Sequence, residues 1–329
     1  MPEKNKTKIG LIGAGYWGKN LVRVFNQLGV LKTVCDSDKE ILKERKEQYP
    51  KIKITDDFSA ILNDKEIKGV VISTPAATHY RLARRAMLAG KDVFIEKPLA
   101  LKVKDGEKLV KLARERNLIL MVGHLLHYHP AMVKLKEIIK RGELGEIKYV
   151  WSNRLNFGKL RRVENVLWSF APHDISVIID FLGMPKRARV AGKSYFKNNI
   201  SDTTLTFLEF DNKKTAHIFG SWLNPFKEQK FVVIGSKKMA VFDGVNNELI
   251  IYPYKIKNHL DKDPIAIKNK QELINFPSKE PLIEEAEHFL KCIRKRETPK
   301  TDGIEGLNVL KVLDACQKSL LKNNKIQKI

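Results

Sequence analysis

The 329-residue sequence has few cysteines, no long apolar run and no internal repeat. Its three cysteines are an odd number and lie far apart, which excludes a disulfide framework and a cysteine zinc site. No stretch of about 18 consecutive apolar residues occurs, which excludes a spanning helix. The polar start MPEKNKTK lacks the pattern of an export signal, and the lack of a repeat excludes a solenoid. We therefore expect a cytoplasmic protein with no membrane partner.

Acidic residues are fewer than basic ones: the sequence has 38 aspartates and glutamates and 61 lysines and arginines, which gives a net charge of +23. A nucleic-acid-binding protein usually concentrates such an excess in one stripe or tail. Here the excess is spread along the chain, and the runs Lys213-Lys214 and Lys237-Lys238 are typical of turns between strands. We expect no nucleic-acid partner and a positive field that favours an anionic small substrate.

The N-terminal part of the chain alternates short apolar strands with helical segments. It opens with KIGLIGAGYWGKNLVRVFNQLG, which predicts a strand, a glycine-rich turn and a helix. Further strand-like runs lie at 31–36, 51–57, 69–74, 92–98 and 118–124. Such alternation is typical of a parallel sheet covered on both faces, the doubly wound Rossmann arrangement of the α/β class. We expect this domain to span residues 1–124.

After Gly145 the pattern changes to strand-like runs separated by Gly, Asn-Lys or Lys-Lys turns. One helix, predicted over 171–183, interrupts these strands, and two helices near 281–296 and 304–322 close the chain. We predict a second, α+β domain over residues 125–329, with a large, mainly antiparallel open sheet and closing helices able to pack back on the first domain. It would bind substrate and, because exposed apolar sheet faces commonly pair, mediate oligomerisation.

The segment GAGYWG matches G-x-G-x-x-G between a predicted strand and a predicted helix. Gly13 permits the tight turn, Gly15 lets the backbone approach a pyrophosphate, and Gly18 allows the helix to pack closely. The second strand ends at Asp36, whose carboxylate can bind ribose hydroxyls and repel a 2′-phosphate. A turn without a ligand and a merely solvated Asp36 are the weaker alternatives. The combination predicts NAD, with NADP less favoured, although Ser37 leaves room for it.

The strand-like run VFIEKPLAL places Glu96 and Lys97 at the sheet edge where open α/β folds bind ligands. A lysine beside a cationic nicotinamide has its charged form disfavoured, so it can exchange a proton with an alcohol during hydride transfer. His79 is expected near the nicotinamide ribose, or alternatively in a capping or buried role. The residues expected around the dinucleotide are Gly13, Gly15, Tyr16, Trp17, Gly18, Asp36, Ser37, Thr74, Pro75, His79, Glu96 and Lys97.

The motifs GAGYWGKN, STPAATH, EKPLAL, GELGEI, PHDIS and TPKTDGIEGLNVL follow one another along nearly the whole chain. In order and approximate spacing they resemble the glucose-fructose oxidoreductase, inositol dehydrogenase and rhizopine catabolism family, Gfo/Idh/MocA. The resemblance implies a nicotinamide-dependent enzyme acting on a sugar or cyclic polyol, often a homodimer or homotetramer. It implies Lys97 as a catalytic residue and His173 as its partner. Many members carry an aspartate where this sequence has Ser169, so proton relay would depend on Lys97 and His173, or on Asp174.

Basic and aromatic side chains gather between 153 and 168, just before His173. Guanidinium groups suit a diphosphate or carboxylate, and an aromatic face suits a sugar or uracil ring. Solvated arginines and a core tryptophan are the alternatives. The segments NVLWSFAPHDIS and SWLNPFKEQK are similar to members encoded with sugar-nucleotide and surface-polysaccharide genes. The residues expected at the substrate are His124, Arg154, Arg162, Asn165, Trp168 and His173.

The histidines of GHLLHYHPA could suggest a metal, but no cysteine or second carboxylate cluster completes a ligand set, and lysine-assisted hydride transfer needs none. The leading hypothesis is therefore an NAD-dependent oxidoreductase acting on a ring carbon, C3, of a UDP-N-acetylhexosamine or its uronic acid. The alternatives are a free sugar or inositol dehydrogenase, a ketosugar reductase, and a non-catalytic NAD-binding sensor.

Overall fold

The computed structural model of this chain describes residues 7–158, 160–161, 163–196, 200–257 and 263–329. The chain divides into two compact units. The first comprises the chain up to Tyr128 together with Glu280–Leu310, and the second comprises His129–Lys279 and Lys311–Ile329. The first unit therefore combines the N-terminal part of the chain with a segment from near its C-terminal end.

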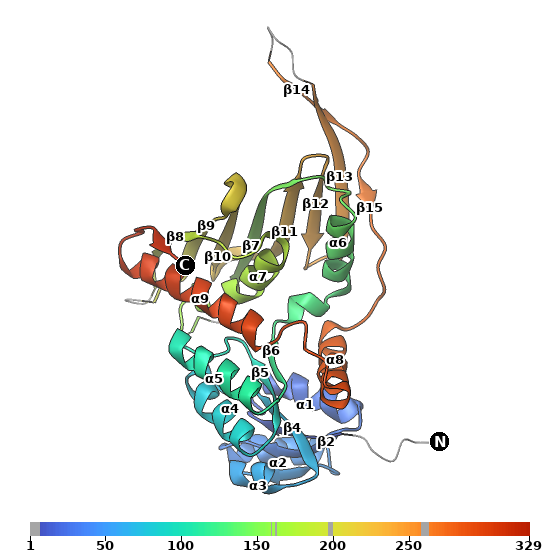
Figure 1. The fold of residues 1–329 in the computed structure, drawn as a ribbon, viewed down its shortest axis with the longest axis vertical. Helices are drawn as coiled ribbons and strands as arrows, with labels where there is room; N and C mark the ends of the chain where they lie inside the picture. The colour runs from blue at the N-terminus through green and yellow to red at the C-terminus, as the bar shows by residue number, and fades with distance from the viewer. Residues whose placement is uncertain (1–6, 159, 162, 197–199, 258–262) are drawn as a thin grey trace. The chain divides into compact units, whose positions relative to one another are not determined.

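The first unit is built on a six-stranded parallel sheet in the order β3-β2-β1-β4-β5-β6 (Figure 1). Its strands are β1 (Lys8–Ile12), β2 (Leu31–Cys35), β3 (Lys53–Thr55), β4 (Ile67–Ile72), β5 (Asp92–Glu96) and β6 (Leu120–Gly123). The order reverses at β1, which has β2 on one side and β4 on the other. This confirms the predicted doubly wound sheet and places its ligand-binding edge at the carboxyl ends of the strands.

Helices cover both faces of this sheet. One apolar cluster joins the sheet to α1 (Gly18–Gln27), α2 (Lys39–Gln48) and α8 (Pro281–Lys295). The opposite cluster joins it to α3 (Phe58–Asn63), α4 (His79–Leu88), α5 (Val103–Glu115) and the start of α9 (Gly303–Leu321). Val71 lies in the first cluster and its neighbours Val70 and Ile72 in the second, as expected for a strand that is buried on both faces.

The returning segment is part of the first unit's core. Phe289 of α8 is fully buried, and its ring meets that of Phe94 edge-on at 5.7 Å. Arg296, just after α8, donates from Nη1 to Asp92 Oδ2 at 2.7 Å. The backbone of Asp302 forms a bridge to Met121 of β6. These contacts bring α8 and the start of α9 to the same sheet as the glycine-rich turn.

The second unit is built on a ten-stranded sheet in the order β14-β13-β12-β11-β7-β10-β9-β8-β16, with β15 paired to β13 (Figure 1). Its pairs are antiparallel except for β7 and β10. This confirms the predicted large, mainly antiparallel sheet. The strands are β7 (Ile147–Phe157), β8 (Arg187–Lys193), β9 (Thr203–Glu209), β10 (Thr215–Ser221), β11 (Leu223–Gly235), β12 (Lys238–Asp243), β13 (Glu248–Lys257), β14 (Ile265–Lys268), β15 (Glu272–Leu273) and β16 (Gln327–Lys328).

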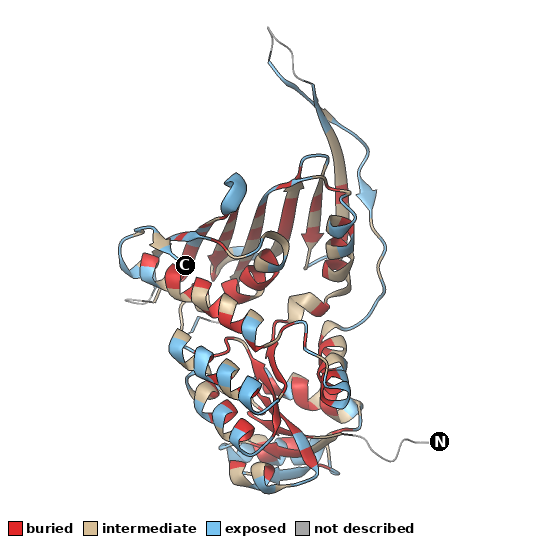
Figure 2. Cartoon of the chain, in the orientation of Figure 1, coloured by how far each residue is buried: buried red, intermediate tan, exposed pale blue. Residues whose placement is uncertain are grey.

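Helices α6 (Pro130–Lys140) and α7 (Val166–Leu182) pack on one face of this second sheet (Figure 1). Buried and less buried residues alternate along the strands of this sheet (Figure 2). On β9, Leu205 and Phe207 are 49 % and 38 % exposed while Leu208 is buried, so the other face keeps apolar side chains exposed. The short 3-10 turns of the chain are η1 (Ala76–Thr78), η2 (Leu125–Tyr128) and η3 (Asp211–Lys213). Within the described parts of the chain, no helix is both long enough and apolar enough to cross a bilayer.

Helix α7 starts at Val166, not at 171 as the sequence pattern predicts. The side chain of Asn165 caps it by accepting a hydrogen bond from the backbone N–H of Trp168, and Val166 and Leu167 are buried. Such an N-cap satisfies a backbone donor that would otherwise lack a partner. The prediction was wrong about this boundary because it took the first turn of the helix for a loop.

Candidate active site

The glycine-rich turn joins β1 to α1 and needs glycine at two positions. Gly13 has a φ of +91°, and a Cβ there would lie 2.7 Å from the carbonyl carbon of Ser73. At Gly18 an added Cβ would lie 1.9 Å from the oxygen of Gly13. At Gly15 an added Cβ would meet only Ile41 Cδ1, at 4.0 Å, an ordinary contact, so the protein itself leaves room beside this part of the turn. The N-terminus of α1 thus has a tightly packed turn beside an open backbone, the arrangement that accepts a pyrophosphate.

Asp36 follows β2 and is held against this turn. Its Oδ2 accepts a hydrogen bond from the backbone N–H of Ala14 at 2.7 Å, and its Oδ1 accepts one from Asp38 at 3.1 Å. The buried Arg45 of α2 donates from Nε to the carbonyl of Ala14 at 3.3 Å. The peptide units on both sides of Ala14 are therefore anchored. The sequence pattern identified Asp36 but not Arg45, whose position on a charged helix gave no signal.

His79 links the loops that follow β4 and β5. Its Nε2 lies 2.9 Å from the carbonyl oxygen of Thr74, and its Nδ1 lies 2.8 Å from that of Pro98. The side chain is only 1 % exposed. Both partners are carbonyls, which only accept, so both bonds form together when the ring carries two protons. The structure thus gives His79 a buried linking role, and its predicted contact with the nicotinamide ribose stays a prediction.

Glu96 and Lys97 lie where β5 ends, as predicted. Glu96 is 8 % exposed, and its Oε1 accepts a hydrogen bond from Trp17 Nε1 at 2.6 Å. Trp17 belongs to the glycine-rich turn, so this bond ties that turn to the strand that carries Lys97. Burial raises the pKa of Glu96, against the opposing effects of the Trp17 hydrogen bond and the Lys97 charge.

A second buried carboxyl group, Glu285 of α8, lies near Glu96. It is 1 % exposed, and its Oε1 has no hydrogen-bond partner among the described residues. Burial, and then the charge of Glu96, raise the pKa of Glu285 well above its usual range. Because α8 comes from a distant part of the sequence, no local pattern pointed to this group. Glu285 therefore favours its neutral form beside the predicted site.

His124 follows β6, the neighbour of β5 in the sheet. Gly123 pairs with Glu96, and a Cβ at Gly123 would lie 3.2 Å from the Glu96 carboxyl group. His124 Nδ1 lies 2.6 Å from Glu305 Oε2, in the first turn of α9. His127 Nε2 lies 4.0 Å from the other oxygen of Glu305. The motif TPKTDGIEGLNVL contains Glu305, but no local pattern links it to His124.

The remaining histidine of that segment, His129, belongs to the second unit. Its Nδ1 accepts a hydrogen bond from the backbone of Ala131 and caps α6, and its ring lies 4.7 Å from that of Phe242. Burial lowers the pKa of His129. His124 and His127 therefore both lie by the carboxylate of Glu305, whereas His129 has a separate environment in the second unit.

In the second unit, Asn165 and Trp168 are both bound to Gln317 of α9. Asn165 Nδ2 and Trp168 Nε1 each donate to Gln317 Oε1 at 2.9 Å. Both side chains are half-buried. Their structural role is thus to fix the first turn of α7 against α9, and their contact with a substrate stays a prediction.

His173 and Asp174 lie in the next turns of α7. Asp174 is 1 % exposed and pairs through Oδ2 with Arg154 Nε of β7 at 2.5 Å. This buried ion pair fixes α7 on the sheet beside the half-buried His173. Ser169, which stands where many family members have an aspartate, is buried one helical turn before His173. Asp174 is thus engaged in an ion pair, which argues against its use as an alternative proton relay.

The three arginines between residues 153 and 168 are Arg154, Arg161 and Arg162, of which Arg154 and Arg162 were expected at the substrate. Arg161 forms an exposed ion pair with Glu164 at 2.7 Å. Arg162 lies outside the described residues. Arg154, through its bond to Asp174, already has an internal partner for one of its nitrogens. The predicted diphosphate clamp therefore remains a prediction.

The three thiols are free and buried. Burial raises the pKa of Cys35 and Cys316 to about 12 and that of Cys292 to about 11. A thiol must lose its proton to act as a nucleophile. These thiols are therefore unsuited to covalent catalysis, including Cys35, which directly precedes Asp36.

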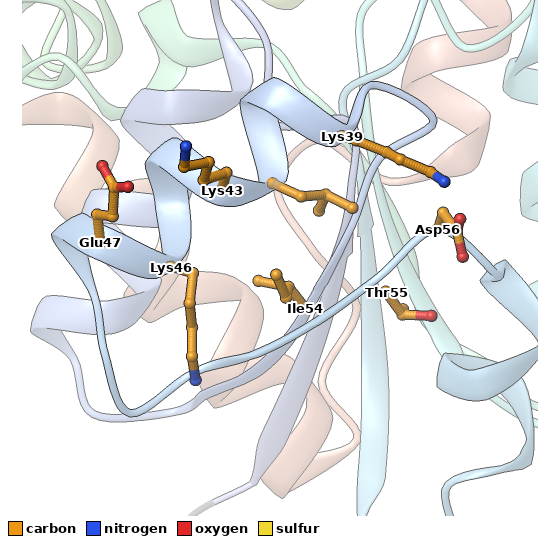
Figure 3. A pocket seen from close by; sticks show the side chains of 8 residues that line it. Lys39, Lys43, Lys46, Glu47, Ile54, Thr55 and Asp56 are labelled. Carbon is orange, nitrogen blue, oxygen red and sulfur yellow. The ribbon is translucent and has the colours of Figure 1, made fainter.

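A surface hollow lies between α2 and β3 (Figure 3). Two of its lining residues, Leu42 and Ile54, are apolar, and the others are charged except for Thr55. The lining residues are Lys39, Leu42, Lys43, Lys46, Glu47, Ile54, Thr55 and Asp56. None of them is a predicted site residue.

Comparison with known proteins places these features in a family. Residues 7–124 match the model described as oxidoreductase family, NAD-binding Rossmann fold. Residues 132–241 match the model described as GFO/IDH/MocA C-terminal domain. Together the two matches cover most of the chain.

Relatives and solved structures of similar length are known. A UDP-N-acetylglucosamine 3-dehydrogenase from Acidithiobacillus ferrooxidans is 26 % identical over 310 residues, 92 % of this chain and 94 % of the relative. A solved structure of that enzyme has a TM-score of 0.85 at 24 % identity, covering 95 % of this chain and 97 % of that one. An NAD⁺-dependent scyllo-inositol 2-dehydrogenase from Bacillus subtilis is 25 % identical over 339 residues, 97 % of this chain and 94 % of the relative. A levoglucosan dehydrogenase solved with NADH and levoglucosan shares the fold, with a TM-score of 0.84 at 20 % identity and coverage of 98 % and 99 %.

Proposed function

Because the chain belongs to the Gfo/Idh/MocA family of NAD-binding oxidoreductases, we propose that it oxidises C3 of a nucleotide-activated sugar. The sugar would be a UDP-N-acetylhexosamine or its uronic acid, used in surface polysaccharide or glycan biosynthesis. The observation that carries this proposal is the similarity, over 92 % of the chain, to a UDP-N-acetylglucosamine 3-dehydrogenase. The site of the first unit supports it with a lysine at the sheet edge.

The residues of the first unit fit a dinucleotide. The open backbone at Gly15 and the N-terminus of α1 would hold the pyrophosphate, where a Cβ would obstruct it. Asp36, anchored at the end of β2, would bind the adenosine ribose and disfavour NADP. Thr74, Pro75 and Glu96 would lie toward the nicotinamide, at the ends of β4 and β5.

Two side chains carry the proton chemistry in this proposal. Lys97 accepts the proton of the hydroxyl that is oxidised, and His173 assists it. Bound NAD supplies the acceptor for the hydride that leaves the same carbon. The substrate alcohol thus loses a hydride and a proton and becomes a ketone, and the ketosugar would then serve a later step such as transamination. With Ser169 in place of an aspartate, no carboxylate from that position assists the relay.

The second unit would supply the contacts to the substrate. We propose that the aromatic face of Trp168 packs on the sugar or uracil ring and that Asn165 contacts it as well. Arg154 and Arg162 would bind the diphosphate. For Arg154 this role is restricted to the guanidinium nitrogens that Asp174 leaves available, since its Nε is bound to that residue.

A second candidate function has specific support. The similarity to a scyllo-inositol 2-dehydrogenase, over 97 % of the chain, supports oxidation of a free polyol or sugar as the alternative. The reverse reaction, reduction of a ketosugar, would use the same residues, because proton and hydride transfer are reversible. A non-catalytic sensor is disfavoured because Lys97 and His173 are both present.

The decisive experiment is a turnover panel followed by NADH absorbance. UDP-N-acetylglucosamine, its uronic acid, free N-acetylglucosamine and scyllo-inositol are each supplied with NAD⁺, with Lys97→Met as the inactive control. We expect kcat/KM for a nucleotide sugar to exceed that for any free sugar by roughly tenfold to a hundredfold, since diphosphate contacts help position the hydroxyl. Equal or better oxidation of scyllo-inositol would instead establish the polyol dehydrogenase. Tight NAD binding without turnover of any compound would favour the sensor.

We also infer a homo-oligomer, a dimer or tetramer, that covers the exposed face of the second sheet. Apolar Leu205 and Phe207 lie on this face, next to the half-buried His217, whose pKa burial lowers. Analytical ultracentrifugation of the wild type and of Phe207→Glu tests this. A monomeric wild type at assay concentration would contradict it. The free thiols fit a reducing compartment, so we place the enzyme in the cytoplasm.

A further inference from the structure

One buried nitrogen at the sheet edge of the first unit has no hydrogen-bond partner in the part of the chain that the structure describes. The side chain of His124 is 1 % exposed, and its Nε2 forms no hydrogen bond with any described residue. A buried polar atom without a partner costs free energy, so such an atom in a folded protein needs an explanation, and a bound water or ligand is one that supplies a partner. His124 follows β6 directly, at the edge where ligands bind in open α/β sheets.

The other ring nitrogen of His124 fixes what this Nε2 can do. Nδ1 lies 2.6 Å from Glu305 Oε2, and a carboxylate only accepts hydrogen bonds. Nδ1 therefore carries the proton, and in the neutral ring Nε2 is left with a lone pair. Glu305 lies in the first turn of α9, where the helix dipole favours a negative charge. The pair thus presents one buried hydrogen-bond acceptor of fixed orientation.

The neighbours of this acceptor point to the nicotinamide end of the dinucleotide. Gly123, the residue before His124, pairs with Glu96, and Glu96 precedes Lys97. Trp17, from the glycine-rich turn, is bonded to the same Glu96. His124 therefore directly follows the strand that neighbours the one carrying the proposed proton acceptor, within the unit that carries all of the dinucleotide motif.

We propose that His124 Nε2 accepts a hydrogen bond from the carboxamide N–H₂ of the nicotinamide, with Glu305 as the positioning residue that fixes the tautomer. The proposal builds on the NAD-dependent function above and moves His124 from the sugar, where the sequence suggested it, to the cofactor. A carboxamide N–H₂ is an uncharged donor and so matches a neutral acceptor in a dry site.

The test compares the binding of NAD⁺ and ADP-ribose, which lacks the nicotinamide, by isothermal titration calorimetry and needs no sugar. We expect His124→Phe to weaken NAD⁺ binding by about twofold to tenfold, the worth of one hydrogen bond, and to leave ADP-ribose binding unchanged. His124→Gln, whose amide oxygen accepts, should restore part of the loss. Glu305→Gln should weaken NAD⁺ alone, because the amide can donate to Nδ1 and so move the ring proton to Nε2.

His288→Phe is the matched control. His288 lies in α8 of the same unit, and its Nε2 accepts from the backbone of Lys300 at 3.1 Å. Its loss should lower the melting temperature without changing the ratio of NAD⁺ to ADP-ribose affinity. An unchanged ratio in His124→Phe, or an equal loss for both ligands, would overturn the proposal. Because the assay uses no sugar, failure of the nucleotide-sugar assignment would leave this result standing.

Discussion

The preference for NAD over NADP should depend on the charge of Asp36, which can be removed without removing its hydrogen-bonding oxygen. Asp36→Asn is the perturbation, since an asparagine oxygen can still accept from the N–H of Ala14, which Asp36 Oδ2 binds at 2.7 Å. The variant should therefore keep the glycine-rich turn in place. What it loses is repulsion of a 2′-phosphate.

The size of that repulsion follows from the exposure of the carboxylate. Two unit charges about 4 Å apart interact by about 1 kcal/mol in water and by about 4 kcal/mol at an effective dielectric constant of 20. Asp36 is half-buried, so its environment lies between these limits. We expect the ratio of NADPH to NADH affinity to rise by roughly thirtyfold, which corresponds to about 2 kcal/mol.

Fluorescence titration of NADH and NADPH measures this ratio. Asp38→Asn is the control, because it removes the same charge two residues away while an oxygen remains to cap α2, where Asp38 accepts from Glu40 at 2.9 Å. Asp36→Ala should in addition weaken NADH binding, since the Ala14 N–H then loses its partner. An affinity ratio in Asp36→Asn that matches the wild type would refute the assignment of Asp36 to the ribose.

Three further outcomes are expected. Lys97→Met should lower kcat by about 10² to 10⁴-fold, since Lys97 moves a proton. Titration with NADH should show nearly unchanged binding, because Lys97 does not hold the pyrophosphate. Gly18→Ala should lose both NAD binding and melting temperature because its Cβ would lie 1.9 Å from a backbone oxygen, whereas Gly15→Ala should lose NAD affinity alone. Glu285→Gln should have a higher melting temperature than the wild type, and the difference should widen as the pH rises from about 4.5. Above that pH ionisation of Glu285 opposes folding, because its pKa is raised in the folded protein. A difference in melting temperature that stays constant with pH would contradict this.

Features with a local signature could be predicted from the sequence. The glycine-rich turn, Asp36 and Lys97 each sit where a short apolar strand ends, and the carboxyl ends of parallel strands share one edge of a sheet. Strand and helix periodicity was sufficient to predict both sheets, which the structure confirms. The start of α7 also has a local signal, the capping residue Asn165, which the sequence-based prediction missed because the first turn of the helix resembles a loop.

Features made by distant segments could not be predicted in this way. His124 and Glu305 are 181 residues apart in sequence, and the partner of His124 exists only because the end of the chain returns to the first unit. The same return buries Glu285 near Glu96. Hydrogen bonding and burial act through space, so two groups that meet this way leave no periodic pattern in either segment.

The class of fold, the dinucleotide turn and the position of the lysine can be predicted from the sequence, because each follows from short-range spacing. The partners of the buried polar groups depend instead on how the chain folds. The fold pairs Arg154 with the buried Asp174, and among the described residues it gives one nitrogen of His124 no hydrogen-bond partner. The reason is that the free energy of a buried polar group depends on its neighbours, which the fold alone brings together.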